Sequence, residues 1–250
     1  MRDSKGVSGW IFGVIVACLS LWDAQNANAA DKILRVHFVN VGFGDAVLIE
    51  SPDLRHFLVD AGPQEYSQEL LGYLSTAGIK TIDAAVITHP HHNHFEGFFS
   101  LLESMPIERL YINGQPQEEE GYDKLLEEFR KPKIPVEILH EGDHLDLGNS
   151  PIRIMVLNPR DLKGSTNDNS LVVWLRYQKT SFLLTSDIGV NQQERIFAQY
   201  PEALKSSCIQ IPHHGWDVSP LLKNAPAETI FVASTGVDTQ HPQAPQNLES

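Results

Sequence analysis

Apolar runs of strand length recur along most of the chain, and polar connections containing Gly, Pro, Asn or Asp separate them. Runs of about four to eight apolar residues between such connections are typical of buried β-strands. The pattern predicts strands at residues 33–39, 46–50, 56–59, 82–88, 109–112, 135–139, 152–157, 171–177, 182–185, 208–211 and 229–233.

Helical patterns lie between some of these runs. In residues 65–77, Leu70, Leu71 and Leu74 recur at helical spacing, and Gly78 follows as a C-terminal cap. Two strand-rich halves with a few helices indicate an α+β fold, in which two sheets pack on each other and the helices lie outside. Further helices are predicted at residues 95–103, 117–130 and 191–200.

The N-terminal region has the composition of a secretory signal peptide. Arg2 and Lys5 precede an apolar stretch at residues 10–22, and Ala27-Asn28-Ala29 supplies an A-x-A cleavage pattern. The apolar stretch is too short to span a membrane comfortably. We therefore predict a signal peptide at residues 1–29 and no transmembrane segment after its cleavage.

The predicted mature domain, residues 30–250, would work outside the cytoplasm, in the periplasm or the extracellular space. An alternative is a lipoprotein processing site ending at Cys18, which the continuation of the apolar run past this residue disfavours. Cleavage at Ala29 leaves Cys208 as the remaining cysteine, so an internal disulfide is excluded. The core, helped by bound metal, must then stabilise the domain.

Composition and charge narrow the classes of function. The chain has 250 residues, of which 42% are hydrophobic, enough for one well-filled domain or two small ones. Its formal net charge is −13, and the mature domain keeps this charge because the predicted signal peptide is charge-balanced. Such a surface repels polyanions and makes tight nucleic-acid binding unfavourable, since that binding rests on many Lys and Arg contacts to phosphate.

Four histidines fall within six residues, in the segment His89-Pro90-His91-His92-Asn93-His94. The apolar run at 82–88 delivers this segment to the end of a predicted strand. His89 and His91 leave the strand and His94 lies where a helix could begin, so the three side chains can converge. Neutral imidazole is the commonest protein ligand for zinc and similar ions. The segment therefore predicts a metal site.

Two further strand ends carry metal-ligating residues. Asp187 follows the apolar run at 182–185, and His213 and His214 follow the run at 208–211. A carboxylate can bridge two cations through its two oxygens, whereas an imidazole cannot. Asp187 alone would fit an ordinary turn, but three strand ends carrying His, Asp and His form a more specific pattern.

Six motifs occur in series along the chain: Val39-Asn40-Val41-Gly42-Phe43-Gly44-Asp45, Leu58-Val59-Asp60-Ala61-Gly62, Thr88-His89-Pro90-His91-His92-Asn93-His94, Asn167-Asp168-Asn169-Ser170-Leu171-Val172, Thr185-Ser186-Asp187 and Pro212-His213-His214-Gly215. Together they resemble the metallo-β-lactamase superfamily, and most of all its branch with the hydrolase domain of ComEC-type DNA-uptake proteins. The resemblance extends from about residue 33 to residue 242. It implies an αββα sandwich of two packed mixed sheets with outer helices. Because the chain ends early relative to the family pattern, this sandwich would be short at its C-terminal end.

The resemblance also implies a centre with one or two divalent metal ions, with Zn²⁺ the first choice and Mn²⁺ the alternative. His89 and His91 would hold the first ion and His94 the second, with Asp187 bridging them. In such centres the ions lower the pKa of a shared water to about 7, so that hydroxide can attack a phosphoryl or carbonyl centre.

Further residues receive roles from the same resemblance. Either His213 or His214 would complete the second position; His214 is favoured, which leaves His213 beside the substrate as an acid or hydrogen-bond donor. Asn169 and Ser170 would line the first position, where other branches place another histidine.

Asp45 and Asp60 would orient ligands from beneath the metals, although turn chemistry in Gly-containing loops explains them equally well. His140 and His144 flank Gly142-Asp143, a pattern typical of a hairpin turn. The polar connection at residues 158–169 is a candidate active-site loop, and the Pro- and Gln-rich tail from Asp238 onward is typical of poor order.

The sequence departs from the family pattern in three places. Asn93 stands where the family has an aspartate that binds the second metal, and its neutral carbonyl oxygen is the poorer ligand for a dication. Asn40 and Phe43 replace the usual Asp and Gln of the first motif. The chain also ends soon after His241-Pro242, so the sheet edge near residues 229–233 would be less covered than in relatives.

The favoured function is an exported metal-dependent hydrolase that cleaves phosphoester or phosphodiester bonds through a metal-bound hydroxide. Its catalysis would depend on His213, Asp187 and Asn93, with the second metal position weakened by Asn93. Nuclease activity follows from the branch analogy, but the charge makes a small-molecule or wall-linked phosphoester substrate equally suitable. One alternative is a non-catalytic metal-binding or interaction protein. Another is an amide or thioester hydrolase, including a β-lactamase, although a suitable extra histidine between His94 and Asp187 is lacking.

Overall fold

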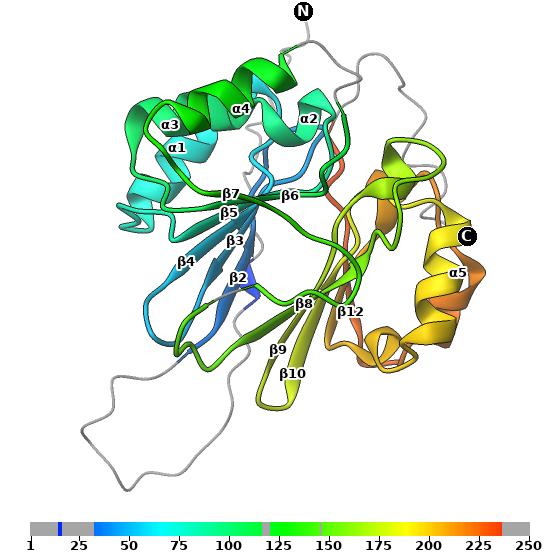
Figure 1. The fold of residues 1–250 in the computed structure, drawn as a ribbon. Coiled ribbons are helices and arrows are strands. Elements are labelled where there is room, and N and C mark those ends of the chain that lie inside the picture. Colours follow the sequence, from blue (N-terminus) through cyan, green and yellow to red (C-terminus); the bar gives the residue numbers. More distant parts are fainter. Residues whose placement is uncertain (1–14, 17–32, 117–120, 146, 237–250) are drawn as a thin grey trace, which may run out of the picture.

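Two β-sheets form the centre of the molecule (Figure 1). The computed structural model describes residues 15–16, 33–116, 121–145 and 147–236. The first sheet has seven strands, whose order in the sheet is their order in the chain; they pair antiparallel from β1 to β4 and parallel from β4 to β7. These strands are β1 (Ile15–Val16), β2 (Arg35–Phe38), β3 (Val47–Glu50), β4 (His56–Val59), β5 (Ala84–Ile87), β6 (Leu110–Ile112) and β7 (Val136–Ile138).

The second sheet has five strands in the order β12-β11-β10-β9-β8. Strands β8, β9 and β10 pair antiparallel, whereas β10, β11 and β12 pair parallel. Both sheets are therefore mixed, as the sequence predicts. The strands are β8 (Arg153–Asn158), β9 (Val172–Tyr177), β10 (Thr180–Leu184), β11 (Cys208–Gln210) and β12 (Ile230–Val232).

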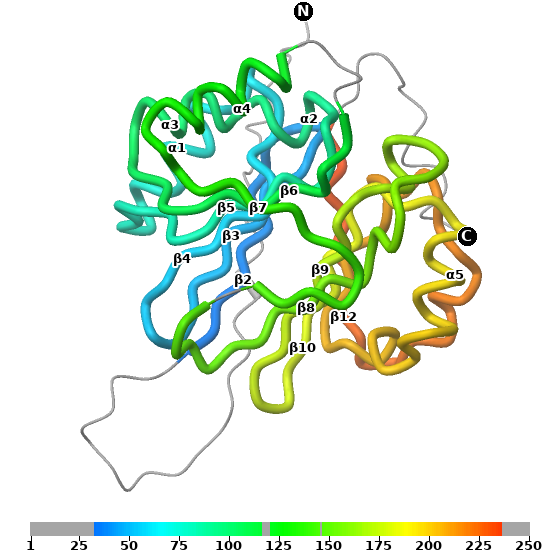
Figure 2. The backbone as a smooth tube through the Cα atoms, viewed as in Figure 1, coloured from blue at the N-terminus to red at the C-terminus, as the bar shows by residue number. Residues whose placement is uncertain are grey.

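Helices lie on the outer faces of both sheets. Helices α1 (Ser67–Thr76), α3 (Gly97–Ser104) and α4 (Tyr122–Arg130) cover the first sheet, and α5 (Val190–Gln199) covers the second (Figure 1). In Figure 2 the first half of the chain, blue to green, builds the first sheet with its helices, and the second half builds the other. This arrangement confirms the predicted α+β fold with an αββα sandwich.

The central strands bury both of their faces. In β3, Ile49 packs toward the second sheet with Val173 of β9, whereas its neighbour Leu48 packs toward the helices with Leu70 and Leu74 of α1. A strand covered on both sides needs apolar residues at successive positions. This explains why the sequence shows continuous apolar runs here and not a strict alternation.

The helix predicted at residues 95–103 is essentially α3, which a separate short helix precedes. A short helix α2 (His92–Phe95) ends before Glu96, and α3 begins at Gly97. The N–H of Gly97 donates to the carbonyl of Gly62, a tertiary bond that replaces the helical bond to Asn93. A Cβ at Gly97 would also collide with the carbonyl of Ala61, so a glycine is needed at this close approach.

The predicted signal peptide lies outside the described residues, except for Ile15 and Val16, which pair with β2. The tail from Asp238 onward also lies outside them. Within the described ranges, no helix combines the length and apolar character that crossing a membrane requires.

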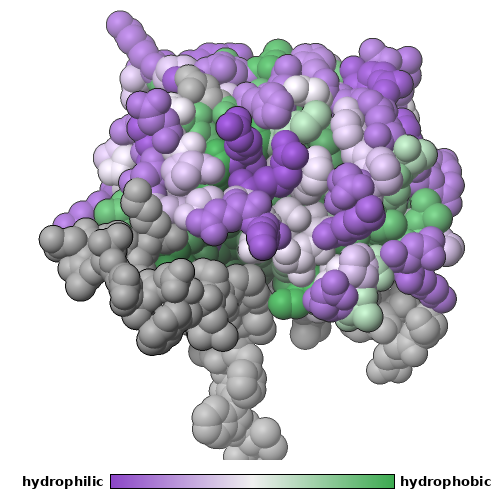
Figure 3. Space-filling model, turned by 90° about the horizontal axis from the view of Figure 1, so that it is seen from below, coloured by the Kyte–Doolittle hydropathy of each residue, from purple (hydrophilic) through white to green (hydrophobic). Residues whose placement is uncertain are grey.

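Strand β12 forms an outer edge of the second sheet, and its Ile230 and Phe231 are 43% and 41% exposed. The end of the molecule that carries the β3–β4 and β9–β10 turns, seen in Figure 3, presents mainly hydrophilic side chains, with hydrophobic ones in smaller areas between them. At the β12 edge, Ile230 and Phe231 therefore leave apolar surface exposed in the described part of the chain.

Candidate metal centre

The candidate site lies where strand ends of the two sheets meet. Asp60 directly follows β4, and His89 stands two residues after β5, the parallel neighbour of β4. Asp187 lies three residues after β10, and His214 lies in the 3-10 turn after β11, the parallel neighbour of β10. Because the carboxyl ends of parallel strands share one edge of a sheet, the topology brings these residues together.

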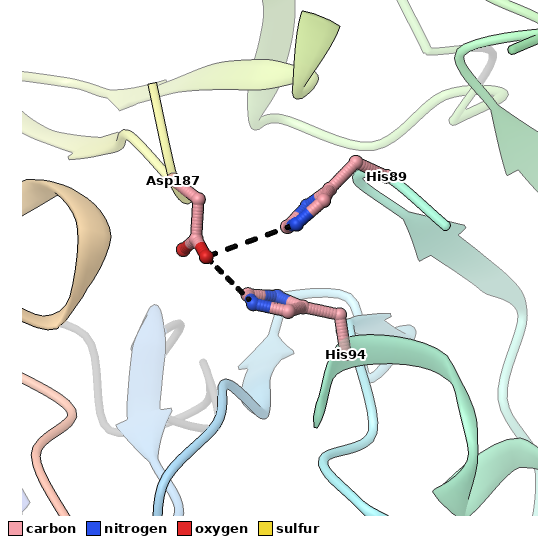
Figure 4. A group of neighbouring side chains, drawn as sticks. All are labelled: His89, His94 and Asp187. Atoms are coloured by element: carbon pink, nitrogen blue, oxygen red, sulfur yellow. Dashed lines mark hydrogen bonds and ion pairs between the residues drawn. The ribbon is translucent and has the colours of Figure 1, made fainter. Parts of the chain in front are cut away.

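Asp187 is the centre of the cluster. Its Oδ2 lies 3.2 Å from Nε2 of His94, 3.5 Å from Nε2 of His214 and 3.7 Å from Nε2 of His89. Figure 4 shows this carboxylate between His89, which leaves β5, and His94, which projects from α2. Nε2 of His213 is 4.0 Å away. The predicted bridging residue therefore faces ring nitrogens from two separate segments, the His89–His94 segment and the turn after β11.

His89 and His91 point their ring nitrogens at each other. Nε2 of His89 lies 2.9 Å from Nδ1 of His91, close enough to share a proton or a cation. On the opposite side of the His89 ring, Nδ1 lies 3.1 Å from the hydroxyl of Thr88. The pair therefore forms a nitrogen-rich position at the residues for which the sequence predicts the first metal; in the candidate ligand trios His89 instead groups with His94 and Asp187.

Hydrogen bonds behind the rings set the tautomers of His94 and His214. Nδ1 of His94 donates to Asp60 Oδ2 at 2.8 Å, and Nδ1 of His214 donates to the Ser234 carbonyl at 2.9 Å. A proton held on Nδ1 leaves the lone pair of each neutral ring on Nε2, and in both residues Nε2 faces Asp187. This is the arrangement in which imidazole binds a metal.

Asp60 is a positioning residue whose side chain is fully occupied. Its Oδ1 accepts from the backbone N–H of Thr88 at 2.8 Å, and its Oδ2 accepts from the Thr88 hydroxyl at 2.7 Å and from His94. The Thr88 hydroxyl also contacts that of Ser186 at 2.8 Å. Asp60 therefore joins the turns after β4, β5 and β10 beneath the site.

The backbone is left-handed at several residues of these turns. Asp60 has φ 58°, Ser186 φ 49°, His213 φ 48° and His214 φ 53°. Residues with a Cβ seldom adopt this conformation, and each instance costs on the order of 1–3 kcal/mol. Four such residues beside one cluster indicate that the fold accepts strain to place these side chains.

Asn93 occupies the side of the site where the family has an aspartate. The nitrogen of its side-chain amide lies 3.1 Å from Nε2 of His214, and its side chain is buried. The residue therefore contacts a predicted ligand of the second metal, but it brings no charge.

The connection at residues 158–169 reaches the site through Asn167. Nδ2 of Asn167 lies 3.1 Å from Nε2 of His213, whose Nδ1 is held by Asp217 Oδ2 at 2.8 Å. The side chains of Asn169 and Ser170 instead bond to the backbone of Lys163 and Asn167 within their own loop. Of the polar residues in this motif, Asn167 makes the contact with a site histidine.

Buried charges dominate the electrostatics of the cluster. Burial opposes protonation of His94, but Asp187 and Asp60 outweigh it and hold the pKa of His94 well above its usual range. The same balance of burial and Asp187 raises the pKa of His214. Burial would raise the pKa of Asp187, yet His94 and His214 hold it well below its usual range. Burial and the charge of His94 lower the pKa of His89 strongly.

These residues fit a divalent metal centre. Ligand atoms on one tetrahedral zinc ion, each about 2 Å from the metal, lie roughly 3–4 Å from one another, and the nitrogen-to-oxygen distances around Asp187 fall in that range. Three trios offer ligand atoms within 4.8 Å of one another: His89, His94 and Asp187; Asp45, Asp187 and His214; Asp45, Asp60 and His94. One carboxylate oxygen each of Asp45 and Asp187 is buried without a hydrogen-bond partner among the described residues.

A family model described as the metallo-beta-lactamase superfamily matches residues 39–201, well over half of the chain. The chain belongs to this superfamily. The matched region contains the whole His89–His94 segment and Asp187, whereas His213 and His214 lie beyond its end.

Two curated relatives in the superfamily are competence proteins. The chain is 26% identical to ComE operon protein 3 of Bacillus subtilis over 72% of its own length and 25% of that protein. It is 25% identical to competence protein ComA of Neisseria gonorrhoeae over 83% of its own length and 28% of that protein. The chain thus spans about a quarter of the length of these relatives.

Two solved structures are similar to this chain at low sequence identity. The metallo-beta-lactamase fold protein YhfI from Bacillus subtilis is 18% identical, with a TM-score of 0.48 and coverage of 69% of this chain and 68% of that one. The subclass B3 metallo-beta-lactamase MEM-A1 from a soil metagenome library is 14% identical, with a TM-score of 0.47 and coverage of 71% and 76%.

The structure places His89, His94 and His214 around the Asp187 carboxylate and His91 against His89, so the residues predicted as ligands lie in one region. Sequence reasoning missed the contributions of Asn167, Asp217 and Ser234, whose residue types are common in loops and carry no distinctive spacing. Asp217 carried the best available signal, because it stands four residues after His213. His140 and His144 lie at the turn predicted for them, where the N–H of Asp143 donates to the backbone carbonyl of His140.

The raised pKa values predict a pH-dependent metal affinity. Metals bind neutral imidazole, so a metal must displace the protons that His94 and His214 retain above their usual pKa of about 6.5. We expect Zn²⁺ affinity to rise with pH between about 6 and 8, with proton release on binding. Calorimetric titrations in buffers of different ionisation enthalpy measure both quantities. An affinity that stays flat over this range would exclude these histidines as ligands.

Proposed function

We propose that this protein is a metal-dependent hydrolase that cleaves phosphoester or phosphodiester bonds. The observation that carries the proposal is the Asp187 carboxylate, which lies within 4.0 Å of the ring nitrogens of His89, His94, His213 and His214. Such a group can be shared between two cations. Membership of a superfamily whose members are mostly hydrolases supports the same reaction class.

The ligands divide into two positions in this proposal. His89 and His91 hold a first ion, and His94 and His214 contribute to a second, with Asp187 between them. Imidazole-rich ligands favour Zn²⁺, with Mn²⁺ as the alternative. A divalent ion held there supplies Lewis acidity toward a phosphoryl oxygen and makes water acidic enough to attack at neutral pH.

His213 is the candidate general acid. Its side chain is 25% exposed, whereas the neighbouring His214 is buried. Asp217 holds the proton on Nδ1, which turns Nε2 toward Asp187 and Asn167. A protonated His213 could therefore give a proton to the leaving-group oxygen at the open side of the site. The buried His214 lacks this access and suits a ligand role.

The net charge bears on the substrate class. At −13, the chain repels a long polyanion at a distance. This supports a small or wall-linked phosphoester, such as a phosphorylcholine ester, in preference to tightly bound nucleic acid. The signal-like N-terminal sequence supports action outside the cytoplasm, in the periplasm or the extracellular space.

A panel of substrates tests the proposal. The purified full-length protein, loaded with Zn²⁺ or Mn²⁺, is assayed on bis(p-nitrophenyl) phosphate, p-nitrophenyl phosphorylcholine, single-stranded DNA and the β-lactam nitrocefin. We expect hydrolysis of a phosphodiester that stops with a chelator and returns with the metal. Faster hydrolysis of nitrocefin would favour the amide-hydrolase alternative. Full metal occupancy without turnover on any substrate would favour the non-catalytic alternative.

Asn93→Asp should strengthen the second metal position. The new carboxylate would replace a neutral amide that contacts His214, so we expect tighter binding of the second ion by more than about tenfold, or about 1.4 kcal/mol. Zn²⁺ titrations of the wild-type and variant proteins measure the change.

Asn149→Asp is the matched control for this substitution, because it adds the same charge at an exposed turn. If second-ion affinity and hydrolysis stay flat in Asn93→Asp, then Asn93 does not limit the site.

A further inference from the structure

Asp45 is a buried carboxylate beside the second metal position. It follows the Gly42-Phe43-Gly44 segment and is 3% exposed. Its ligand atoms lie within 4.8 Å of those of Asp187 and His214, and its Oδ1 is 4.0 Å from Nδ1 of His214. A carboxylate therefore lies next to the position at which the family pattern has a charged aspartate and this chain has the neutral Asn93.

The hydrogen bonds distinguish Asp45 from Asp60. Asp60 is saturated by Thr88 and His94, so it can only orient other groups. Oδ1 of Asp45, in contrast, is buried and accepts no hydrogen bond within the described part of the chain. A buried carboxylate oxygen without a partner is costly unless a cation compensates it.

Asp187 shows the same feature. Its Oδ1 is also buried without a hydrogen-bond partner among the residues that the structure describes. The carboxylates of Asp45 and Asp187 form a ligand trio with the imidazole of His214, in which one ligand atom of each residue lies within 4.8 Å of the others. This trio is richer in oxygen than the pair of His89 and His91.

The backbone holds Asp45 firmly in place. Its N–H donates to the carbonyl of Asn93 at 3.3 Å, and its own carbonyl accepts from the N–H of Gly62 at 2.8 Å. A Cβ at Gly44 would collide with the Asn93 carbonyl, so the glycine permits this close approach. The Asp45 loop is therefore docked directly on the turn that carries Asn93.

Phe43 closes the other side of the same loop. Its ring centroid lies 4.4 Å from that of His214. The aromatic ring excludes water from that side of the imidazole and lowers the local dielectric, which strengthens charge interactions within the site. Phe43, which replaces the usual Gln of this motif, therefore packs on the ring of His214, the imidazole that Asp45 also approaches.

We propose that Asp45 is a direct ligand of the second divalent cation, together with Asp187 and His214, and supplies the carboxylate that Asn93 lacks. This inference rests on the metal centre of the proposed function and deepens it. The carboxylate of the second position then comes from the loop before β3 and not from the His89–His94 segment. The negative charge of that position is thereby preserved. Asn93 then lies beside His214 without supplying a ligand.

Zn²⁺ titration of purified full-length Asp45→Asn, measured alongside the wild type, tests the inference. Asn preserves the shape of the side chain but removes its charge. We expect the second equivalent to bind more than about 100-fold more weakly, beyond the 10–100-fold cost typical of residues that only orient ligands. The first equivalent should bind as in the wild type.

The double variant Asp45→Asn/Asn93→Asp separates a ligand role from a structural one. It returns a carboxylate to the same position from a different turn, so the second equivalent should bind again. The ligand-field spectrum of bound Co²⁺ should lose its second component in the single variant and regain it in the double variant. Asp83→Asn, which removes a carboxylate that accepts from His56 at the far end of β5, is the matched control and should change neither.

Several results would overturn the inference. The inference is wrong if the wild type binds one Zn²⁺ throughout, or if Asp45→Asn keeps the wild-type affinity for the second ion or loses both equivalents. It is also wrong if the double variant does not regain binding of the second equivalent. Because these readouts use metal alone, they do not depend on turnover. A protein that shows the expected binding pattern but hydrolyses no phosphodiester would contradict the proposed function and leave the ligand assignment standing.

Discussion

Asp187→Asn should abolish metal binding and hydrolysis together. Its carboxylate faces ring nitrogens from both the His89–His94 segment and the turn that carries His214, so it links the two metal positions. An amide of the same shape offers one neutral oxygen and no bridging charge. We expect the affinity for both Zn²⁺ equivalents to fall by more than about 100-fold, beyond the effect of losing an orienting residue, and phosphodiester turnover to vanish. Metal analysis after gel filtration and the substrate panel measure the two losses.

Asp161→Asn controls for the removal of a carboxylate, because Asp161 is exposed in the 158–169 connection and pairs with Lys163. This variant should keep its metal and its activity. An Asp187→Asn protein that retained both ions would contradict the assignment of Asp187 as the shared ligand.

Asp60→Ala should produce the largest loss of stability. Three donors would lose their acceptor: the N–H and hydroxyl of Thr88 and the ring of His94. An unsatisfied buried donor costs about 1–3 kcal/mol, so we expect the free energy of unfolding to fall by at least about 3 kcal/mol. Ala also tolerates the left-handed backbone at this position less well than Asp. Urea unfolding of the metal-free protein measures the loss.

Asp60→Asn provides the comparison. It keeps the side-chain shape and an oxygen for the Thr88 N–H, so it should be more stable than Asp60→Ala. Both variants should bind metal more weakly, because His94 loses the acceptor that fixes its tautomer. Equal stability of Asp60→Ala and the wild type would show that these buried bonds contribute little.

The fold was accessible from the sequence because the central strands bury both faces. Continuous apolar runs mark such strands, and the histidine segment and Asp187 stand directly after two of them. Residues at the carboxyl ends of parallel strands converge, so the main ligands could be predicted without coordinates. The break between α2 and α3 could not, because it depends on the tertiary bond from Gly97 to Gly62.

The finer parts of the site depend on contacts between distant segments. Nothing in the sequence near Asp45 places it beside His214, and its motif fitted a Gly-rich turn equally well. The acceptor for Nδ1 of His214 is a backbone carbonyl, that of Ser234, which every residue type provides. Asn167 faces His213 only because its loop folds back across the site. Residue type and spacing carry no signal for such contacts.

The division of the ligands between the two sheets has a consequence for assembly. His89, His91 and His94 belong to the first half of the chain, whereas Asp187 and His214 belong to the second. A chain that is made N-terminus first completes the first sheet, with its imidazoles and Asp45, before Asp187, the carboxylate shared by both positions, exists. Tight metal capture therefore waits until the two layers have docked. A bound ion then links the two layers, in a domain whose described residues include no disulfide.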